Sequence, residues 1–199
     1  MQLLESFFGN KIAACAVYTG DGTILVDRNE LTAFNDTVLP HLDSAYNLAR
    51  WLTRNDQDAE DVVQEAFLRA FKYWKGFSGR DSRSWVLAIV RNTFYSWLRQ
   101  RTVQPELTAD GEIDGVDDGV PNPENVLLRN ADRELLKSAL EDLPGEFREA
   151  IILREMEGLS YKEIADIAAV PIGTIMSRLA RARKRLQIYL TNAAARNYS

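Results

Sequence analysis

The sequence predicts an all-α protein in which an acidic linker joins two small helical domains. Apolar residues recur every three to four positions over residues 34–101 and again over residues 126–192, the period of a helix with one buried face. Between them, residues 102–125 hold three prolines, three glycines and no apolar periodicity, as a linker does. We therefore expect two domains, a flexible linker and an N-terminal extension at residues 1–33.

The N-terminal extension is expected to form a short β-hairpin. The apolar runs KIAACAVY and TILVD flank a glycine-rich turn at residues 19–22. A lone two-stranded hairpin is marginal in water, so it must pack on another part of the protein to persist. No function is assigned to it.

The first domain is predicted to be a three-helix bundle. Its first helix extends from Leu31 to about Arg54, with Pro40 near its first turns. Residues 55–58 break that helix, and Asp58 opens the second, which continues to Trp74. A Gly- and Ser-rich loop leads to the third helix, from about Ser84 to Arg101.

Positive charge and aromatic rings are concentrated in the same part of this domain. From Arg69 to Arg101 there are eight basic residues and one acidic residue, and nine of the nineteen aromatic residues lie between Phe67 and Trp97. Single-stranded nucleic acid binds such surfaces, because bases stack on rings and cations hold the backbone. Most of the rings are expected in the core, Phe67, Phe71 and Trp97 among them; Tyr73, Trp74, Phe77, Trp85 and Tyr95 are left open.

Charge along the chain alternates by segment. The net charge is -5, yet residues 36–65 hold seven acids and two bases, and residues 102–128 hold seven acids and no base. The linker is therefore either a solvated tether or a segment that lies in a positively charged channel otherwise occupied by nucleic acid.

The second domain is predicted to end in a helix-turn-helix. Two helices, which end at Leu143-Pro144 and at Gly158, supply its core. Ser160 and Glu163 form a capping-box pattern at the start of the next helix, and Pro171 ends that helix and opens the last one. Five of the eight residues from 178 to 185 are basic, which favours a phosphate-binding face over an ordinary solvated hairpin.

Composition argues against other classes of protein. One cysteine and one histidine give neither an internal disulfide nor a metal-ligand cluster, so no metal and no cofactor are expected. The longest apolar run near the start is too short to span a bilayer, so we expect a cytoplasmic protein without a membrane partner. The acidic residues of the linker could not be tuned by burial, so no catalytic residue and no enzyme are predicted.

Several motifs together resemble those of the extracytoplasmic-function (ECF) class of bacterial RNA polymerase sigma factors. They are DAEDVVQEAF at residues 58–67, VRNT at 90–93, the Leu143-Pro144 break, GLSY at 158–161 and SRLARAR at 177–183. The resemblance covers roughly residues 34 to 190, in the family's order and spacing. It implies that the two domains are sigma regions 2 and 4, and residues 1–33 have no counterpart in it.

The resemblance also implies sites and partners. The expected partners are core RNA polymerase, through the clamp helices of its largest subunit and the flap of its beta subunit, promoter DNA and an anti-sigma factor. The implied polymerase-binding residues are Asp61, Gln64, Glu65 and Phe67. Those implied for the promoter's -10 element are Phe77, Arg80, Arg83, Ser84, Trp85, Arg91 and Asn92. For the -35 element they are Thr174, Met176, Ser177, Arg178, Arg181 and Lys184, of which Arg178 and Lys184 are expected to hold phosphates.

Two other kinds of binding protein share part of this pattern. A helix-turn-helix regulator of the response-regulator output kind shares the segment around GLS, but it does not account for DAEDVVQEAF or the basic aromatic helix. A sigma-like mimic that sequesters an anti-sigma factor would be expected to lose the basic recognition helix, which is intact here.

Overall fold

The computed structural model describes residues 28–79, 81–103 and 133–197, and every regular element in these ranges is a helix, as predicted. The predicted β-hairpin lies outside the described residues, as does the predicted linker apart from residues 102 and 103, which continue a helix. Within the described part of the chain, no helix has the length and apolar character needed to cross a membrane.

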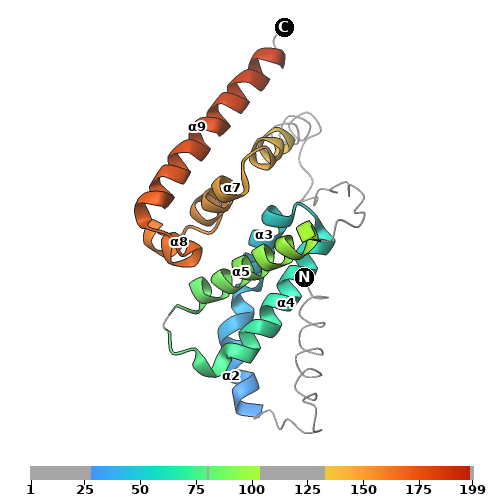
Figure 1. Cartoon of the computed structure of the whole chain (residues 1–199), viewed down its shortest axis with the longest axis vertical. Helices are drawn as coiled ribbons and strands as arrows, with labels where there is room; N and C mark the ends of the chain where they lie inside the picture. Colours follow the sequence, from blue (N-terminus) through green and yellow to red (C-terminus); the bar gives the residue numbers. More distant parts are fainter. Residues whose placement is uncertain (1–27, 80, 104–132, 198–199) are drawn as a thin grey trace, which may run out of the picture.

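The first unit, residues 28–103, is a bundle in which α3, α4 and α5 pack on one another (Figure 1). Its elements are α2 (Arg28–Val38), η1 (Leu39–His41), α3 (Leu42–Thr53), α4 (Asp56–Tyr73), η2 (Trp74–Gly76) and α5 (Ser82–Val103). Phe34, Leu48, Phe67 and Leu87 are fully buried in it. The single first helix predicted from Leu31 to Arg54 is wrong: it is divided by η1, because Pro40 has no amide to continue the α-helical hydrogen bonds.

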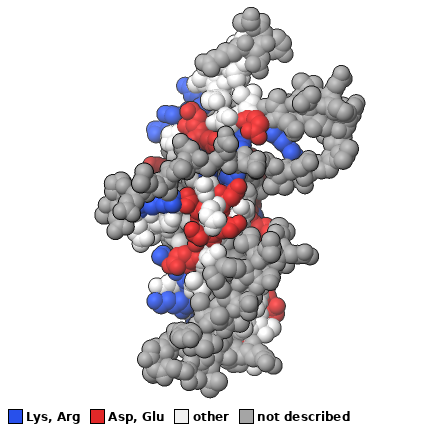
Figure 2. All heavy atoms as spheres, turned by 90° about the vertical axis from the view of Figure 1, so that its right-hand side faces the viewer, with Lys and Arg blue, Asp and Glu red and all other residues white. Residues whose placement is uncertain are grey.

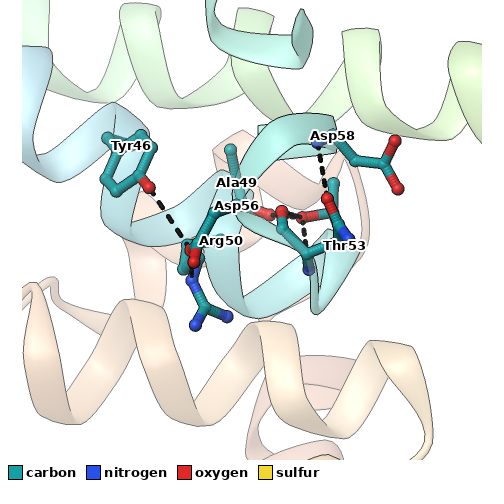
Figure 3. Close-up of polar contacts among 7 residues, drawn as sticks. Tyr46, Ala49, Arg50, Thr53, Asp56 and Asp58 are labelled. Carbon is teal, nitrogen blue, oxygen red and sulfur yellow. Dashed lines mark hydrogen bonds and ion pairs between the residues drawn. The ribbon is translucent and has the colours of Figure 1, made fainter. Parts of the chain in front are cut away.

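Local polar contacts fix the turn between α3 and α4 (Figure 3). The Asn55 side chain accepts a hydrogen bond of 3.0 Å from the amide of Asp58, so α4 begins at Asp56, two residues before the predicted start. Asp56 forms an ion pair with Arg50 and lies 3.4 Å from the hydroxyl of Tyr46. These contacts set the direction in which α4 leaves the turn.

The second unit, residues 133–197, contains the predicted helix-turn-helix. It consists of a helix at residues 133–141, α7 (Gly145–Ile151), a π-helical turn η3 (Ile152–Met156), α8 (Tyr161–Ala168) and α9 (Ile172–Asn197). The predicted capping box is confirmed: Ser160 accepts from the amide of Glu163, whose carboxylate accepts from the amide of Ser160 at 2.6 Å. Helix α9 continues to Asn197.

The two units pack directly on one another. Helix α7 contacts α3, and α8 contacts α5, so the second unit lies across one end of the bundle (Figure 1). Buried apolar residues of both units belong to one hydrophobic cluster. The two units therefore share one core.

Candidate functional site

An acidic hollow lies between α4 and α5. It encloses about 350 Å³ and is lined by Asp61, Val62, Glu65, Arg69, Thr93, Trp97 and Gln100. Asp61 and Glu65 are exposed at it, and Glu65 accepts a hydrogen bond of 2.7 Å from Arg69. The Thr93 hydroxyl is buried and lacks a hydrogen-bond partner. Such a hollow can receive a cationic or amide side chain from another protein.

The side chains predicted to bind polymerase do not all lie on this surface. Gln64 is half-buried on α4, next to Glu65. Phe67 is only 1% exposed and fills the bundle core, so we leave it out of the binding surface. The apolar stripe of α4 explains its burial, because Phe67 follows Val63 by four residues.

The view from the right-hand side of Figure 1 shows how charge is distributed there. Asp and Glu side chains gather in the middle of the visible surface, and Lys and Arg lie mostly along its left edge (Figure 2). An acidic patch with a basic border attracts a partner of opposite pattern and orients it during encounter.

Aromatic rings hold the segment that leads into α5. Phe77 stacks on Trp74 with ring centroids 5.5 Å apart and lies 4.7 Å from the ring of Trp85. Phe77 and Trp85 keep partial exposure in this cluster. Arg80, also predicted to bind DNA, lies outside the described residues.

The first turn of α5 is tied to the second unit. Arg83 donates to Glu157 at 2.5 Å and to the hydroxyl of Ser44 at 3.3 Å. The amide of Ser84 donates to the Asp81 carboxylate at 3.0 Å, which caps the helix. The Ser84 hydroxyl itself is buried without a hydrogen-bond partner.

About two turns further along α5, Arg91 is also paired across the two units. Its Nε lies 2.6 Å from a carboxylate oxygen of Glu149, and the hydroxyl of Tyr95 donates to the other oxygen at 2.7 Å. Burial, and then the negative charge of Glu149, raises the pKa of Tyr95 above its usual value. Asn92, beside Arg91, is exposed.

The last helix, α9, divides its residues between core and solvent. Ile175, Leu179 and Ala182 are buried against α7 and α8. The opposite side presents polar and basic groups near the start of the helix. Of the predicted residues, Met176, Ser177, Arg181 and Lys184 are exposed, Thr174 is half-buried, and Arg178 is held 2.6 Å from Glu146.

Comparison with known proteins matches both units to one family. The family models Sigma-70 region 2 and Sigma-70, region 4 match residues 37–103 and 133–186. The ECF RNA polymerase sigma factor SigE of Mycolicibacterium smegmatis is 35% identical over 82% of this chain, and the match spans 64% of that relative's own length. The ECF RNA polymerase sigma-E factor of Escherichia coli K12 is also 35% identical, over 81% of this chain and 88% of that protein. The chain belongs to the ECF class of RNA polymerase sigma factors.

Solved structures show the same fold. The sigma factor RpoE of Bartonella quintana, crystallised with the anti-sigma factor NepR, matches 80% of this sigma factor and 97% of the solved chain, with a TM-score of 0.65 and 32% identity. CnrH, solved with the cytosolic domain of CnrY, matches 81% of this chain and 90% of its own, with a TM-score of 0.58 and 23% identity. The latter shows likeness of fold alone.

Sequence reasoning missed the residues of this sigma factor that connect its two units. Glu149 and Glu157 carry the interface carboxylates, and Arg148 carries a buried guanidinium. A signal was present, because Arg148 and Glu149 stand four and three residues before Ile152 and so share the buried face of their helix. Charged residues on such a face need partners, but the sequence does not say from which unit.

Proposed function

We propose that this sigma factor binds core RNA polymerase through α4 and reads a promoter with α5 and α9. The observation that carries the proposal is the division of charge: the hollow between α4 and α5 takes its carboxylates from α4, whereas basic groups lie at the start of α5 and on the exposed side of α9. The polymerase and the promoter would therefore contact different surfaces of the chain.

The hollow between α4 and α5 suits the clamp helices of the polymerase largest subunit. Asp61 and Glu65 offer carboxylates to arginine side chains, and charge-assisted pairs of that kind are stronger than neutral hydrogen bonds. Trp97 supplies an apolar wall to the hollow. Gln64 adds an amide on the same helix.

The segment from Phe77 to Asn92 suits the -10 element. Opening a duplex there extrudes a base at a cost of a few kcal/mol, which a pocket of rings and nearby cations can offset. Phe77 and Trp85 supply ring faces, and Arg83 and Arg91 supply positive charge. Ser84 lies beside them in the first turn of α5.

The start of α9 suits the major groove at the -35 element. Met176, Ser177 and Arg181 project from one exposed side, and Thr174 stands one turn before Arg178. Arg178 and Lys184 would contact phosphates, which position the helix without reading bases. The flap of the beta subunit would then contact the second unit.

An anti-sigma factor is the natural antagonist of these surfaces. RpoE of B. quintana, which is 32% identical, was solved in complex with one. We infer that a protein of the same kind binds this chain and covers the surfaces used for polymerase and DNA. The protein would then act in the cytoplasm and would itself catalyse no reaction.

Transcription with purified components tests the proposal. The protein is added to core polymerase and genomic DNA, and the 5' ends of the transcripts are sequenced. We expect initiation at a discrete set of sites that share -10 and -35 motifs. Absence of specific initiation by an active core would refute the function.

Charge reversal tests the assignment of the surfaces. D61K/E65K should weaken core binding about tenfold or more, because two attractive contacts become repulsive. The matched control, D36K/D43K, reverses two exposed acids of the same unit and should leave the affinity unchanged. R181A should instead alter use of the -35 element and lower the salt dependence of promoter binding by about one unit of slope. If D61K/E65K and R181A gave the same defect, the division of labour would be wrong.

A further inference from the structure

The first turns of α9 expose apolar side chains at the end of the helix that lies beside α8 (Figure 1). Ile172 and Met176 are 49% and 53% exposed, and Ala180 is exposed about one turn further along. Residues four apart on a helix are neighbours on its surface, so these three side chains form one strip, which we call the apolar ridge. In a helix-turn-helix, the first residues of the second helix are those that contact base edges.

Positive charge borders the apolar ridge. Lys184 follows Ala180 by four residues and is exposed, and Arg181 is exposed on the next line of the helix. Among the residues that the structure describes, no carboxylate pairs with Arg181. Cations beside an apolar strip suit a duplex, because phosphates flank the base edges along each groove. The charge therefore favours DNA as the occupant of the ridge.

Other polar groups near the ridge are engaged within the second unit. The hydroxyl of Ser177 donates to the carbonyl of Thr174 at 2.8 Å, so it can only accept a hydrogen bond from a base. Arg178 lies 2.6 Å from Glu146, and its side chain is only 16% exposed. What α9 offers to base edges is therefore chiefly Arg181 and the apolar ridge.

The chemistry of the major groove decides what an apolar ridge can recognise. Each base presents hydrogen-bond donors or acceptors there, and thymine alone adds an apolar group, its C5 methyl. The thioether side chain of Met176 is unbranched and polarisable, so it can adjust to a methyl group in contact with it. A ridge without donors gains most from bases that carry that methyl.

We propose that Met176, with Ile172 and Ala180 beside it, reads the -35 element through thymine methyl groups. The inference rests on the proposed function of α9 and names the contact by which that helix selects its site. Arg181 would add hydrogen bonds, and arginine commonly makes these to guanine. We therefore expect the mapped -35 elements to share at least one A·T pair next to a G·C pair.

Replacing thymine by uracil isolates the contribution of the methyl group, because uracil pairs in the same way and lacks only that group. Holoenzyme made from core polymerase and the full chain is titrated with a mapped promoter whose -35 thymines are replaced one at a time. At a contacted position, the affinity for the thymine promoter should exceed that for the uracil promoter about fourfold, as expected for one buried methyl group. Uracil placed between the -35 and -10 elements should have no effect.

Three variants assign the contact to the ridge. M176A should bind the thymine promoter more weakly and should bring the ratio of the two affinities close to one. M176L keeps an apolar side chain of similar volume and should retain the ratio. The matched control is I188A, which truncates a side chain that is 52% exposed about three turns beyond Met176 on the same helix; it should leave the ratio unchanged.

The outcomes distinguish this inference from the proposed function. If the parent holoenzyme initiates at specific promoters but binds thymine and uracil equally, the inference is overturned and the proposed function stands. The same holds if M176A weakens binding to both promoters equally, since the ridge would then serve a contact with polymerase. If the parent chain directs no specific initiation, the proposed function fails and the inference fails with it.

Discussion

Arg148 provides a test of how the second unit is stabilised. It is 3% exposed and donates four hydrogen bonds to carbonyls, those of Leu140, Glu141 and Leu143 in its own unit and that of Trp51 in the first. Charged hydrogen bonds contribute about 1.5–3 kcal/mol each, so four suggest a large loss. Burial, followed by repulsion from Arg54, lowers the pKa of Arg148 to about 10, which shows that burying its charge is costly. A substitution that removes the charge therefore regains part of the free energy lost with the hydrogen bonds. We expect Arg148→Met to lower the free energy of unfolding by about 3–5 kcal/mol.

The chain offers a way to see which unit loses that stability. All four tryptophans, at positions 51, 74, 85 and 97, are in the first unit, so their fluorescence follows that unit while far-UV circular dichroism follows both. In urea, Arg148→Met should shift the circular dichroism transition more than the fluorescence transition. The control Arg183→Met removes an exposed ion pair with Glu155 and should cost about 1 kcal/mol or less. Equal losses in the two variants would refute the idea that buried carbonyls depend on Arg148.

Three further predictions concern local structure and pH. Ser160→Ala removes the cap of α8 and should lower the stability of the second unit by about 1 kcal/mol, measured by urea unfolding. Gly158 and Ala169 both have left-handed backbone, at φ +67° and +53°, so Gly158→Ala should destabilise and Ala169→Gly should stabilise, each by about 0.5–1 kcal/mol; shifts of the same sign would contradict this. Burial, and then the charge of Arg83, lowers the pKa of His41 below 6.5. The unfolded chain therefore binds more protons than the folded chain, so the free energy of unfolding falls as the pH drops through the window just below 6.5. His41→Asn should flatten that dependence on pH in unfolding followed by fluorescence.

The features that the sequence predicted well are those that depend on neighbours in the chain. The capping box at Ser160 involves residues three apart, and the buried stripe of α9 follows from helical spacing alone. The break at Pro40 was underestimated because the apolar pattern continues through it, even though proline removes the amide that the pattern requires.

The interface between the units could not be predicted, because its contacts join residues that are far apart in the chain. Glu157 and Asn47 are separated by 110 positions, and no local pattern joins them. Reading Phe67 as a binding residue came from a motif, whereas its burial follows from the packing of α4 in the bundle. The assignments of residues to polymerase and promoter likewise stay predictions until the variants above are measured.

The contact between the units depends on charged partners that belong to both of them. The side chains of Glu149 and Glu157 are 2% and 5% exposed, and each pairs with an arginine of the first unit. Removing one partner of a buried pair leaves an uncompensated charge, which costs about 3–5 kcal/mol, whereas replacing both partners by apolar residues is often neutral. The two carboxylates therefore make the contact specific, because the second unit can bury them only where Arg91 and Arg83 are within reach.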